Sequence, residues 1–484
     1  MSLINQICES NLRSINIVGV PGAGKTTLVT NISSRESARL FLYLSFGREN
    51  TKSASSRMGN NVTCSSFHSY AKRAMDIDNS RIVKSYSMRI ASENLKLLGI
   101  DLKGAKMLEA FCILNDEFCM SGFPLRQLNS VAIKVKNYLP FLTKQEKNEL
   151  IIAFGQFWQK LWSAKDRKKL KVTHNMYFKA YAESANRVPF DVVVVDEYQD
   201  LNDAMISLID RFLAVDLKLK VIRLGDPVQQ IYSFNGASSQ FSKSNFHFRL
   251  RESYRFGKSL CELANSFMAA QDIGYYTNIL PGNQKVTTSL EYSKDVKVII
   301  ELAKAKKFPT IIARNNSTLW HMIKNIAIAG LKCSLAGNDK KELDFLRALF
   351  QLKNHEKTNH PALRGKSYFS YVNNAKLNKN SSALLAARFV EKIGDDEALF
   401  SKIEKSLTSK SEADVLLTTV HQAKGLEFNH VILANDFTPC VTTDGQFKKV
   451  EIEEAHTIYT AITRAKKSLT VPKSWRSLKL DSFR

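Results

Sequence analysis

Several features that define other protein classes are missing from this sequence of 484 residues. Its seven cysteines are scattered, and no two have the C-x-x-C spacing typical of zinc sites. No uninterrupted apolar run approaches the roughly 20 residues that cross a bilayer. The opening stretch MSLINQICES has no apolar core of the kind found in signal peptides. We therefore expect a cytoplasmic protein without a membrane anchor or a disulfide framework.

Acidic residues are few compared with basic ones. The chain has 70 Lys and Arg against 46 Asp and Glu, a formal net charge of +24. This excess indicates a polyanionic partner, first nucleic acid and second a membrane surface, with general solubility as the alternative. Basic residues concentrate at 126–171 (11 against 3 acidic) and at 353–379 (6 against 1). Either stretch could also be a solvated loop or helix face.

The N-terminal region contains a phosphate-binding pattern. Residues 15–30 read INIVGVPGAGKTTLVT, a short apolar strand followed by a glycine-rich loop and an expected helix. This context distinguishes the P-loop GxxxxGK[ST] from an incidental glycine loop. The loop amides would wrap the phosphates of ATP, Lys25 would add a point charge, and Thr26 would supply a hydroxyl to Mg²⁺. The loop residues expected to bind ATP are Gly19, Pro21, Gly22, Ala23, Gly24, Lys25, Thr26 and Thr27.

A second pattern, DVVVVDEYQDLND at 191–203, ends a run of four valines on two carboxylates. The valines predict a strand buried on both faces of a parallel sheet, and ligands bind beyond the carboxyl ends of such strands. Two desolvated carboxylates require a cation, which Mg·ATP on the P-loop would bring. We expect Asp196 to hold Mg²⁺, directly or through water, and Glu197 to act as general base on the attacking water. A structural ion pair is the alternative. These patterns predict a nucleoside triphosphatase.

With these motifs in place, the sequence resembles superfamily 1 helicases of the UvrD/Rep/PcrA type. DEYQD at 196–200 is similar to the DExQD box of that family. Further similar stretches follow in family order, from Gln6 to about residue 470: LYLSFGREN (42–50) and SSFHSYAKR (65–73) for motifs Ia to Ic, LGDPVQQIYSFNGA (224–237) for III, LRESYRFGKSL (250–260) for IV, TTVHQAKGLEF (418–428) for V and IYTAITRAKKSL (458–469) for VI. Motifs III to VI are most similar to the F-box DNA helicase branch and its compact bacterial relatives.

The resemblance implies roles for individual residues of the ATP site. Gln6 would recognise adenine, Tyr254 would stack on the base, and Glu427 would hold the ribose. Gln229 would sense the γ-phosphate, and Arg255 and Arg464 would act as arginine fingers, because phosphoryl transfer needs charge neutralisation on the transferred oxygens. For the two arginines, a surface ion pair is the alternative. The catalytic set implied is Lys25, Glu197, Gln229, Arg255 and Arg464.

The resemblance also implies a DNA-binding set. Phe46, Tyr232 and Phe234 would stack on bases, and Ser66 and His68 would touch the backbone. Packing in the core is the alternative for such aromatics. UvrD-type motif III often has Trp-Arg where this chain has Phe234-Asn235, which removes a stacking surface and a cation. The segment KVTHNMYFKAYAE (171–183) resembles one that precedes the DExQD strand in the F-box branch, and for its histidine we expect a structural role.

The expected fold class is α/β, with two RecA-like P-loop lobes, each a parallel sheet flanked by helices. Motif positions then predict the domain limits: lobe 1A at 1–75 and 184–245, a basic helical insertion 1B at 76–183, lobe 2A at 246–338 and 412–484, and a reduced insertion 2B at 339–411. ATP would bind between lobes 1A and 2A, and both insertions would contact DNA.

The function implied is that of an ATP- and Mg²⁺-dependent DNA helicase or translocase. It would move 3′→5′ on single-stranded or tailed duplex DNA, in repair, recombination control or phage defence. The alternative is a DNA-sensing regulatory ATPase subunit that unwinds little and partners a nuclease, as compact UvrD-like proteins do in Gabija-like anti-phage systems. RNA as the substrate is a third interpretation that charge leaves open.

Overall fold

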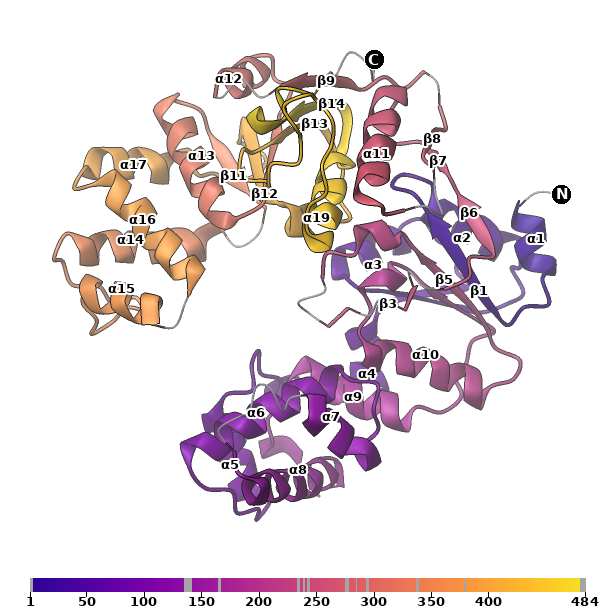
Figure 1. Ribbon diagram of the computed structural model, residues 1–484. Helices are drawn as coiled ribbons and strands as arrows, with labels where there is room; N and C mark the ends of the chain where they lie inside the picture. Colours follow the sequence, from indigo (N-terminus) through magenta and orange to yellow (C-terminus); the bar gives the residue numbers. More distant parts are fainter. Residues whose placement is uncertain are drawn as a thin grey trace. The chain divides into compact units, whose positions relative to one another are not determined.

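The chain folds into two compact units, each built on its own parallel sheet (Figure 1). The first unit comprises Met1–Gly19 and Gly24–Leu250, and the second comprises Val20–Ala23 and Arg251–Arg484. The predicted α/β class with two RecA-like lobes is confirmed. The structure, a computed structural model, describes residues 3–134, 142–163, 167–232, 236–237, 240–241, 244–274, 278–283, 285–292, 296–336, 339–377 and 380–478.

The sheet of the first unit has six parallel strands in the order β3-β2-β4-β5-β1-β6. The strands are β1 (Ser14–Gly19), β2 (Phe41–Ser45), β3 (Val62–Ser66), β4 (Val192–Val195), β5 (Lys220–Gly225) and β6 (Phe248–Leu250). Because the strands are parallel, their carboxyl ends lie along one edge of the sheet. The P-loop follows β1 and the DEYQD segment follows β4, so the sheet brings both motifs to that edge.

The four valines of β4 divide between two hydrophobic cores. Val192 and Val194 pack with Ile15, Ile17 and the helix α2 on one side of the sheet. Val193 and Val195 pack on the other side, in a larger core that extends into the helical insertion. A strand in mid-sheet has apolar neighbours on both faces, which explains an apolar run without alternation.

Helices α1 to α10 belong to the first unit. Those nearest the sheet are α1 (Leu3–Glu9), α2 (Lys25–Arg35), α3 (Arg48–Ser55), α4 (Phe67–Ala74), α9 (His174–Ser184) and α10 (Asp203–Val215). The insertion between α4 and α9 adds α5 (Met88–Leu97), α6 (Ala105–Met120), α7 (Leu128–Lys134) and α8 (Lys144–Ser163). In Figure 1 these four helices gather into one violet cluster, which α9 joins to the rest of the unit. The described residues between positions 76 and 183 are thus mostly helical.

The second unit has a six-stranded parallel sheet in the order β11-β12-β10-β13-β14-β9. Its strands are β9 (Ser289–Tyr292), β10 (Thr310–Ala313), β11 (Cys333–Leu335), β12 (Val415–Thr419), β13 (Phe428–Leu433) and β14 (Ala465–Val471), and a short pair, β7 (Glu252–Ser253) and β8 (Leu280–Pro281), lies outside it. The motif positions predict that the second lobe begins at residue 246, but β6 (Phe248–Leu250) pairs with β1 and so extends the first sheet.

An insertion between β11 and β12 carries the helices α14 to α17. Its bounds are α14 (Asp339–Lys353), α15 (Tyr368–Leu377), α16 (Ser381–Ile393) and α17 (Glu397–Ser406). It packs on α13 (Asn316–Ile328) and shares one hydrophobic core with the sheet. The remaining helices are α11 (Lys258–Gln271), α12 (Val296–Lys304), α18 (Val420–Ala423) and α19 (Ile452–Ile462).

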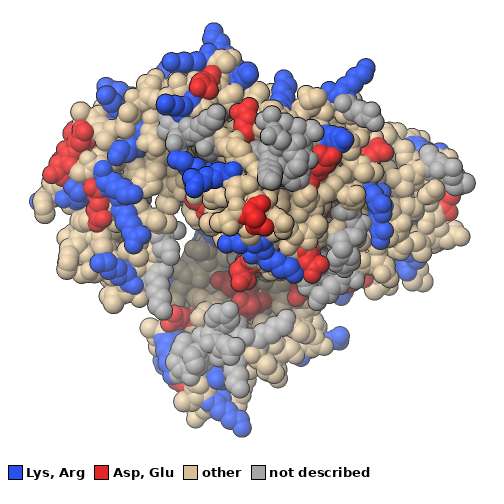
Figure 2. Space-filling view, turned by 45° about the horizontal axis from the view of Figure 1, so that its top comes forward, with Lys and Arg blue, Asp and Glu red and all other residues tan. Residues whose placement is uncertain are grey.

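On the face that Figure 2 shows, the described Lys and Arg side chains are spread out, with Asp and Glu between them. A search of the described helices finds none long and apolar enough to cross a membrane.

Candidate active site and nucleic-acid interface

The loop between β1 and α2 has a backbone that favours glycine. Gly22 and Gly24 have φ angles of 76° and 74°, in the left-handed region. A Cβ on Gly22 would lie 2.5 Å from the Cβ of Arg255, which leaves no room for a side chain. Ala23 N donates to Val20 O over 3.1 Å and closes the turn. The first amides of α2 then face the loop, as an anion-binding helix terminus requires.

Lys25 begins α2 and extends back across this loop. Its Nζ donates to Gly19 O over 3.0 Å. A Cβ on Gly19 would lie 2.8 Å from the Lys25 Cγ, so the glycine makes room for the lysine stem. Thr27 is exposed in the first turn of α2, and Gln6 is exposed on α1. The ammonium group is thus held at the strand end, where the phosphates of a P-loop nucleotide would lie.

Asp196 directly follows β4 and is buried. Its N–H donates to Leu44 O over 2.9 Å, which continues the pairing with β2. One carboxylate oxygen accepts from the Tyr43 phenol, and the other accepts from Glu197 N over 3.0 Å. Burial first, and then the charge of Glu197, raise the pKa of Asp196 to about 6, although Lys25 opposes them. A divalent cation at this position would favour the ionised carboxylate.

Glu197 has a φ of 53°, which is uncommon for a residue with a side chain. Gln199 Nε2 donates to Glu197 Oε2 over 2.6 Å, and its Oε1 accepts from Asp226 N over 3.1 Å. Gln199 therefore ties the expected general base to the end of the neighbouring strand β5. Sequence reasoning gave Gln199 no role of its own.

Asp226 was also missed from the sequence. It follows β5 as Asp196 follows β4, and its side chain accepts from Gln229 Nε2 over 2.8 Å and from Val228 N over 3.1 Å. Burial raises its pKa, against the charge of Lys25. A weaker signal was available, because Asp226 directly follows the stretch KVIRLG, in which apolar residues are interrupted by Lys220 and Arg223. The structure brings Lys25, Asp196, Glu197 and Gln229 together at one sheet edge, with Asp226 among them.

The oxygen donors at this edge fit a nucleotide-bound Mg²⁺. Thr26 offers a hydroxyl and Asp196 a carboxylate, and Mg²⁺ in phosphate sites is bound through one or two such groups plus phosphates and waters. Among the described residues, no cluster of three or more His, Cys, Asp or Glu forms a metal cage. Thr26 and Asp196 would hold a metal that arrives with its nucleotide.

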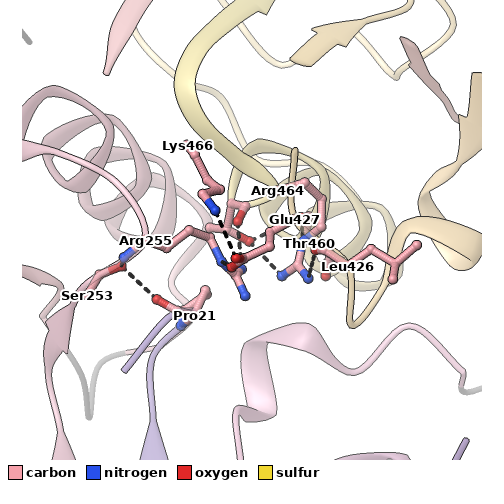
Figure 3. Close-up of polar contacts among 9 residues, drawn as sticks. Pro21, Ser253, Arg255, Leu426, Glu427, Thr460, Arg464 and Lys466 are labelled. Atoms are coloured by element: carbon pink, nitrogen blue, oxygen red, sulfur yellow. Dashed lines mark hydrogen bonds and ion pairs between the residues drawn. The ribbon is translucent and has the colours of Figure 1, made fainter. Parts of the chain in front are cut away.

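In the second unit, Arg255 is held by an acidic and a carbonyl group (Figure 3). Its Nε donates to Glu427 Oε2 over 2.9 Å, and its Nη1 donates to Thr463 O over 2.8 Å. Lys466 Nζ lies 3.1 Å from the other oxygen of Glu427. Burial raises the pKa of Glu427, but Arg255 and Lys466 outweigh it and hold the pKa below its usual value. Glu427 is therefore an ionised acceptor between two cations.

Arg464 lies beside this group and is almost fully buried. Its Nε donates to Thr460 O over 2.9 Å, its Nη1 to Leu426 O over 3.1 Å, and its Nη2 to Thr463 Oγ1 over 3.2 Å (Figure 3). Thr463 thus contacts both predicted arginine fingers. The two guanidinium groups are positioned by neighbouring segments, and neither is a loose surface side chain.

The segment after β7 contacts the P-loop peptide that belongs to the same unit. Ser253 Oγ donates to Pro21 O over 2.8 Å, and Tyr254 N donates to Gly22 O over 3.0 Å. The Tyr254 ring lies against Gly282, where a Cβ would come within 2.9 Å of it. The side chain of Tyr254 is 57% exposed, so one ring face is accessible for stacking.

Two residues of the predicted DNA-binding set form an aromatic stack. The rings of Phe46 and Tyr232 have centroids 5.5 Å apart and planes inclined by 26°. Phe46 is only partly buried, so it is not one of the fully buried residues of the hydrophobic core. Phe234 and Asn235 lie outside the described residues.

A cavity of about 590 Å³ lies beside Phe46 and includes the other two predicted DNA contacts, Ser66 and His68. Ser66 caps α4 by accepting from Ser69 N over 3.3 Å. The lining of the cavity is Phe46, Ser66, His68, Ser69, Lys72, Asn79, Ile82, His174, Asn175 and Tyr177. The rings of Phe46 and Tyr177, the cation of Lys72 and several neutral polar groups suit a nucleotide unit of a single strand.

Helix α9 supplies part of this cavity, which sequence reasoning did not foresee. His68 Nε2 lies 3.0 Å from Asn175 Oδ1, and His174 Nδ1 lies 2.8 Å from the Tyr177 hydroxyl. Burial lowers the pKa of His68, so it is neutral at pH 7. His174 keeps the satisfied hydrogen bond expected of a structural histidine, yet it also lines the cavity. Only the similarity of 171–183 to a helicase segment had drawn attention to it.

Comparison with known proteins identifies related chains. Residues 125–475 match the UvrD-like helicase C-terminal domain, and residues 4–235 match an AAA domain. F-box DNA helicase 1 of Gallus gallus is 26% identical over 499 residues, covering 96% of this chain and 48% of that protein. F-box DNA helicase protein 1 of Schizosaccharomyces pombe is 24% identical over 517 residues, covering 96% and 56%. Gabija protein GajB of Bacillus cereus is 25% identical over 331 residues, covering 58% and 63%. The chain thus spans about half the length of the F-box helicases that it matches.

Proposed function

Because the chain belongs to the UvrD-like helicases, we propose that it hydrolyses ATP to move 3′→5′ along single-stranded DNA and to separate duplex strands. The observation that carries this proposal is the sheet edge at which Lys25 lies near two buried carboxylates, Asp196 and Asp226. Buried carboxylates beside a P-loop lysine suit the binding of a metal–nucleotide complex. The similarity to two F-box DNA helicases supports DNA as the substrate.

Each residue of this edge then has a task in hydrolysis. The loop amides and Lys25 bind the phosphates, and Thr26 and Asp196 hold Mg²⁺, which would neutralise phosphate charge. Glu197, oriented by Gln199, accepts the proton of the attacking water. Gln229, oriented by Asp226, responds to the γ-phosphate.

We also assign roles to the predicted ATP contacts outside this edge. Tyr254 stacks on the adenine that Gln6 recognises, and Glu427 binds the ribose. Arg255 and Arg464 stabilise the charge of the transferred phosphoryl group. Arg255 would exchange its Glu427 partner for the γ-phosphate, so nucleotide binding rearranges this cluster.

Single-stranded DNA is held by the Phe46–Tyr232 stack and the neighbouring cavity, with Phe234 as a third stacking residue. A ligand shifts an equilibrium between two conformations only as far as its affinities for them differ. ATP must therefore bind more tightly to one of the conformations that contact DNA, so that binding and hydrolysis move the protein along the strand. The basic insertions at 76–183 and 339–411 extend the DNA contact. We place the activity in DNA repair, recombination control or phage defence.

Strand displacement on tailed duplexes tests this proposal. The assay uses duplexes with a 3′ or a 5′ single-stranded tail, Mg·ATP, and Lys25→Ala as the matched inactive control. Unwinding from the 3′ tail alone is expected. Unwinding from the 5′ tail would contradict the direction, and equal unwinding by Lys25→Ala would contradict the ATP site.

A second candidate function is a DNA-sensing ATPase subunit that partners a nuclease and unwinds little. The similarity to Gabija protein GajB favours it, as does the compact insertion between β11 and β12. The same assay separates the two functions, because a sensor would show DNA-stimulated ATP hydrolysis without strand displacement. RNA oligonucleotides as competitors would then report on nucleic-acid preference.

A further inference from the structure

Tyr43 carries a buried hydroxyl in the middle of the strand β2, and the proposed mechanism does not use it. It lies at the centre of β2, between Leu42 and Leu44, and is 1% exposed. Buried tyrosines usually place their hydroxyl on a polar partner. The partner here is Asp196, which the proposed function makes a Mg²⁺ ligand.

The register of the sheet makes this contact specific. Tyr43 lies opposite Val194 in the parallel pairing of β2 with β4. Side chains alternate along a strand, so Asp196, two residues after Val194, points to the same face as Tyr43. That face packs against α2, whose first turn carries Thr26.

The phenol therefore contacts one of the residues expected to hold Mg²⁺, Asp196. Tyr43 donates to one oxygen of Asp196, and Glu197 N donates to the other over 3.0 Å. Two donors on two oxygens fix the plane of the carboxylate. Each oxygen has a second lone pair, so the hydrogen bonds leave room for a cation or its water.

We propose that Tyr43 is a positioning residue for the Mg²⁺ of the ATP site, holding Asp196 in the arrangement that the metal requires. The inference rests on the proposed function, since it presupposes that Asp196 and Thr26 bind Mg·ATP. Groups that orient metal ligands through hydrogen bonds typically change metal affinity or activity about 10–100-fold when removed.

The test uses Tyr43→Phe, which keeps the ring and removes only the hydroxyl, and compares this variant with Tyr86→Phe. Tyr86 is a buried tyrosine of the same unit whose hydroxyl accepts from Asn94 over 2.9 Å, away from the nucleotide edge. Binding of a fluorescent ATP analogue is measured in EDTA and during a Mg²⁺ titration, and circular dichroism checks folding. The titration reads metal binding directly and does not depend on turnover.

For Tyr43→Phe we expect nucleotide affinity in EDTA within twofold of wild type and a half-saturating Mg²⁺ concentration raised about 10-fold. Tyr86→Phe should match wild type in both. A Mg²⁺ response of Tyr43→Phe within twofold of wild type, or an equal shift in Tyr86→Phe, would overturn the inference. A wild-type chain whose ATP binding is indifferent to Mg²⁺ would overturn the proposed site together with it.

A double-mutant cycle keeps the test decisive if Tyr43→Phe folds poorly. Asp196→Asn removes the charge of the side chain that accepts the hydrogen bond of Tyr43. If Tyr43 acts through Asp196, adding Tyr43→Phe to Asp196→Asn should leave the Mg²⁺ response unchanged. A further loss of response in the double variant would reject the positioning role.

Discussion

Arg255 Nε lies 2.9 Å from Glu427 Oε2, so a predicted arginine finger is paired with the residue expected to hold the ribose. Glu427 also binds Lys466 over 3.1 Å, and it therefore bridges two cations. The pairing keeps the guanidinium oriented near Thr463, which also contacts Arg464. In the proposed function, this carboxylate would link ribose binding to the position of Arg255.

Removing Arg255 should impair hydrolysis more than nucleotide binding. Arginine fingers contribute about 10³–10⁵ to the rate of phosphoryl transfer, so Arg255→Ala should lower kcat of the DNA-stimulated ATPase by at least 10²-fold. The matched control is Arg314→Ala, which breaks an ion pair of 2.8 Å with Glu454 in the same unit. A comparable loss of kcat in the control, or none in Arg255→Ala, would contradict the role.

Lys25→Ala and Glu197→Gln should abolish turnover for different reasons. Lys25→Ala removes the cation at the phosphates, so ATP affinity should fall as well. Glu197→Gln keeps the shape of the side chain and its neighbour Gln199 but removes the proton acceptor, so ATP should bind without turnover. Glu36→Gln, in the exposed pair with Arg39, is the control. Normal turnover in either site variant would refute the site assignment.

The pKa of Asp196 predicts a pH-dependent stability of the nucleotide-free chain. Its folded value of about 6 exceeds the ordinary 3.8. The contribution of this carboxyl to the free energy of unfolding is therefore full below about pH 4 and is lost as the pH rises through about 6. Asp196→Asn should raise the apparent melting temperature at pH 8 and have little effect near pH 4. The difference corresponds to on the order of 3 kcal/mol, since one pKa unit is about 1.4 kcal/mol.

Asp216 provides a control of opposite sign for this prediction. A backbone hydrogen bond from Lys218, together with Arg187, holds the pKa of Asp216 below its usual value. Asp216→Asn should therefore lower the melting temperature at pH 8, and the loss should shrink as the pH falls through the lowered pKa. Melting curves at pH 4, 6 and 8 measure both variants. If Asp196→Asn instead lowers the melting temperature at pH 8, its neighbours stabilise the ionised carboxylate of Asp196, and the prediction is contradicted.

The Phe46–Tyr232 stack predicts a measurable loss of DNA affinity. Stacking of a base on an aromatic side chain contributes about 1–3 kcal/mol, so Phe46→Ala should weaken single-stranded DNA binding by roughly 5- to 150-fold. Phe46→Tyr retains the ring and should bind within about twofold of wild type. Fluorescence anisotropy with a labelled oligonucleotide at fixed salt measures this effect. Equal affinities of Phe46→Ala and Phe46→Tyr would assign Phe46 to packing alone.

The sequence alone determined the features that local patterns encode. The stretch from Ile15 to Thr26 specifies a strand, a glycine loop and a helix, and the structure places β1 and α2 on either side of the loop. Val192 to Val195 form the buried strand that their uninterrupted apolar character predicts. Neighbouring residues determine these features through backbone conformation and hydrophobicity, so no knowledge of distant contacts is needed.

Tertiary structure decided which distant groups act together. Tyr43 and Asp196 are 153 positions apart, and His68 and Asn175 are 107 apart. No local pattern relates such residues, because their meeting depends on strand order and on helix packing across an insertion. Asp226 and Gln199 became site residues for the same reason, since the pairing of β4 with β5 sets their ends side by side. Motifs in the sequence specify which chemical groups are present, whereas the parallel register of the sheet specifies which of them come within hydrogen-bonding distance.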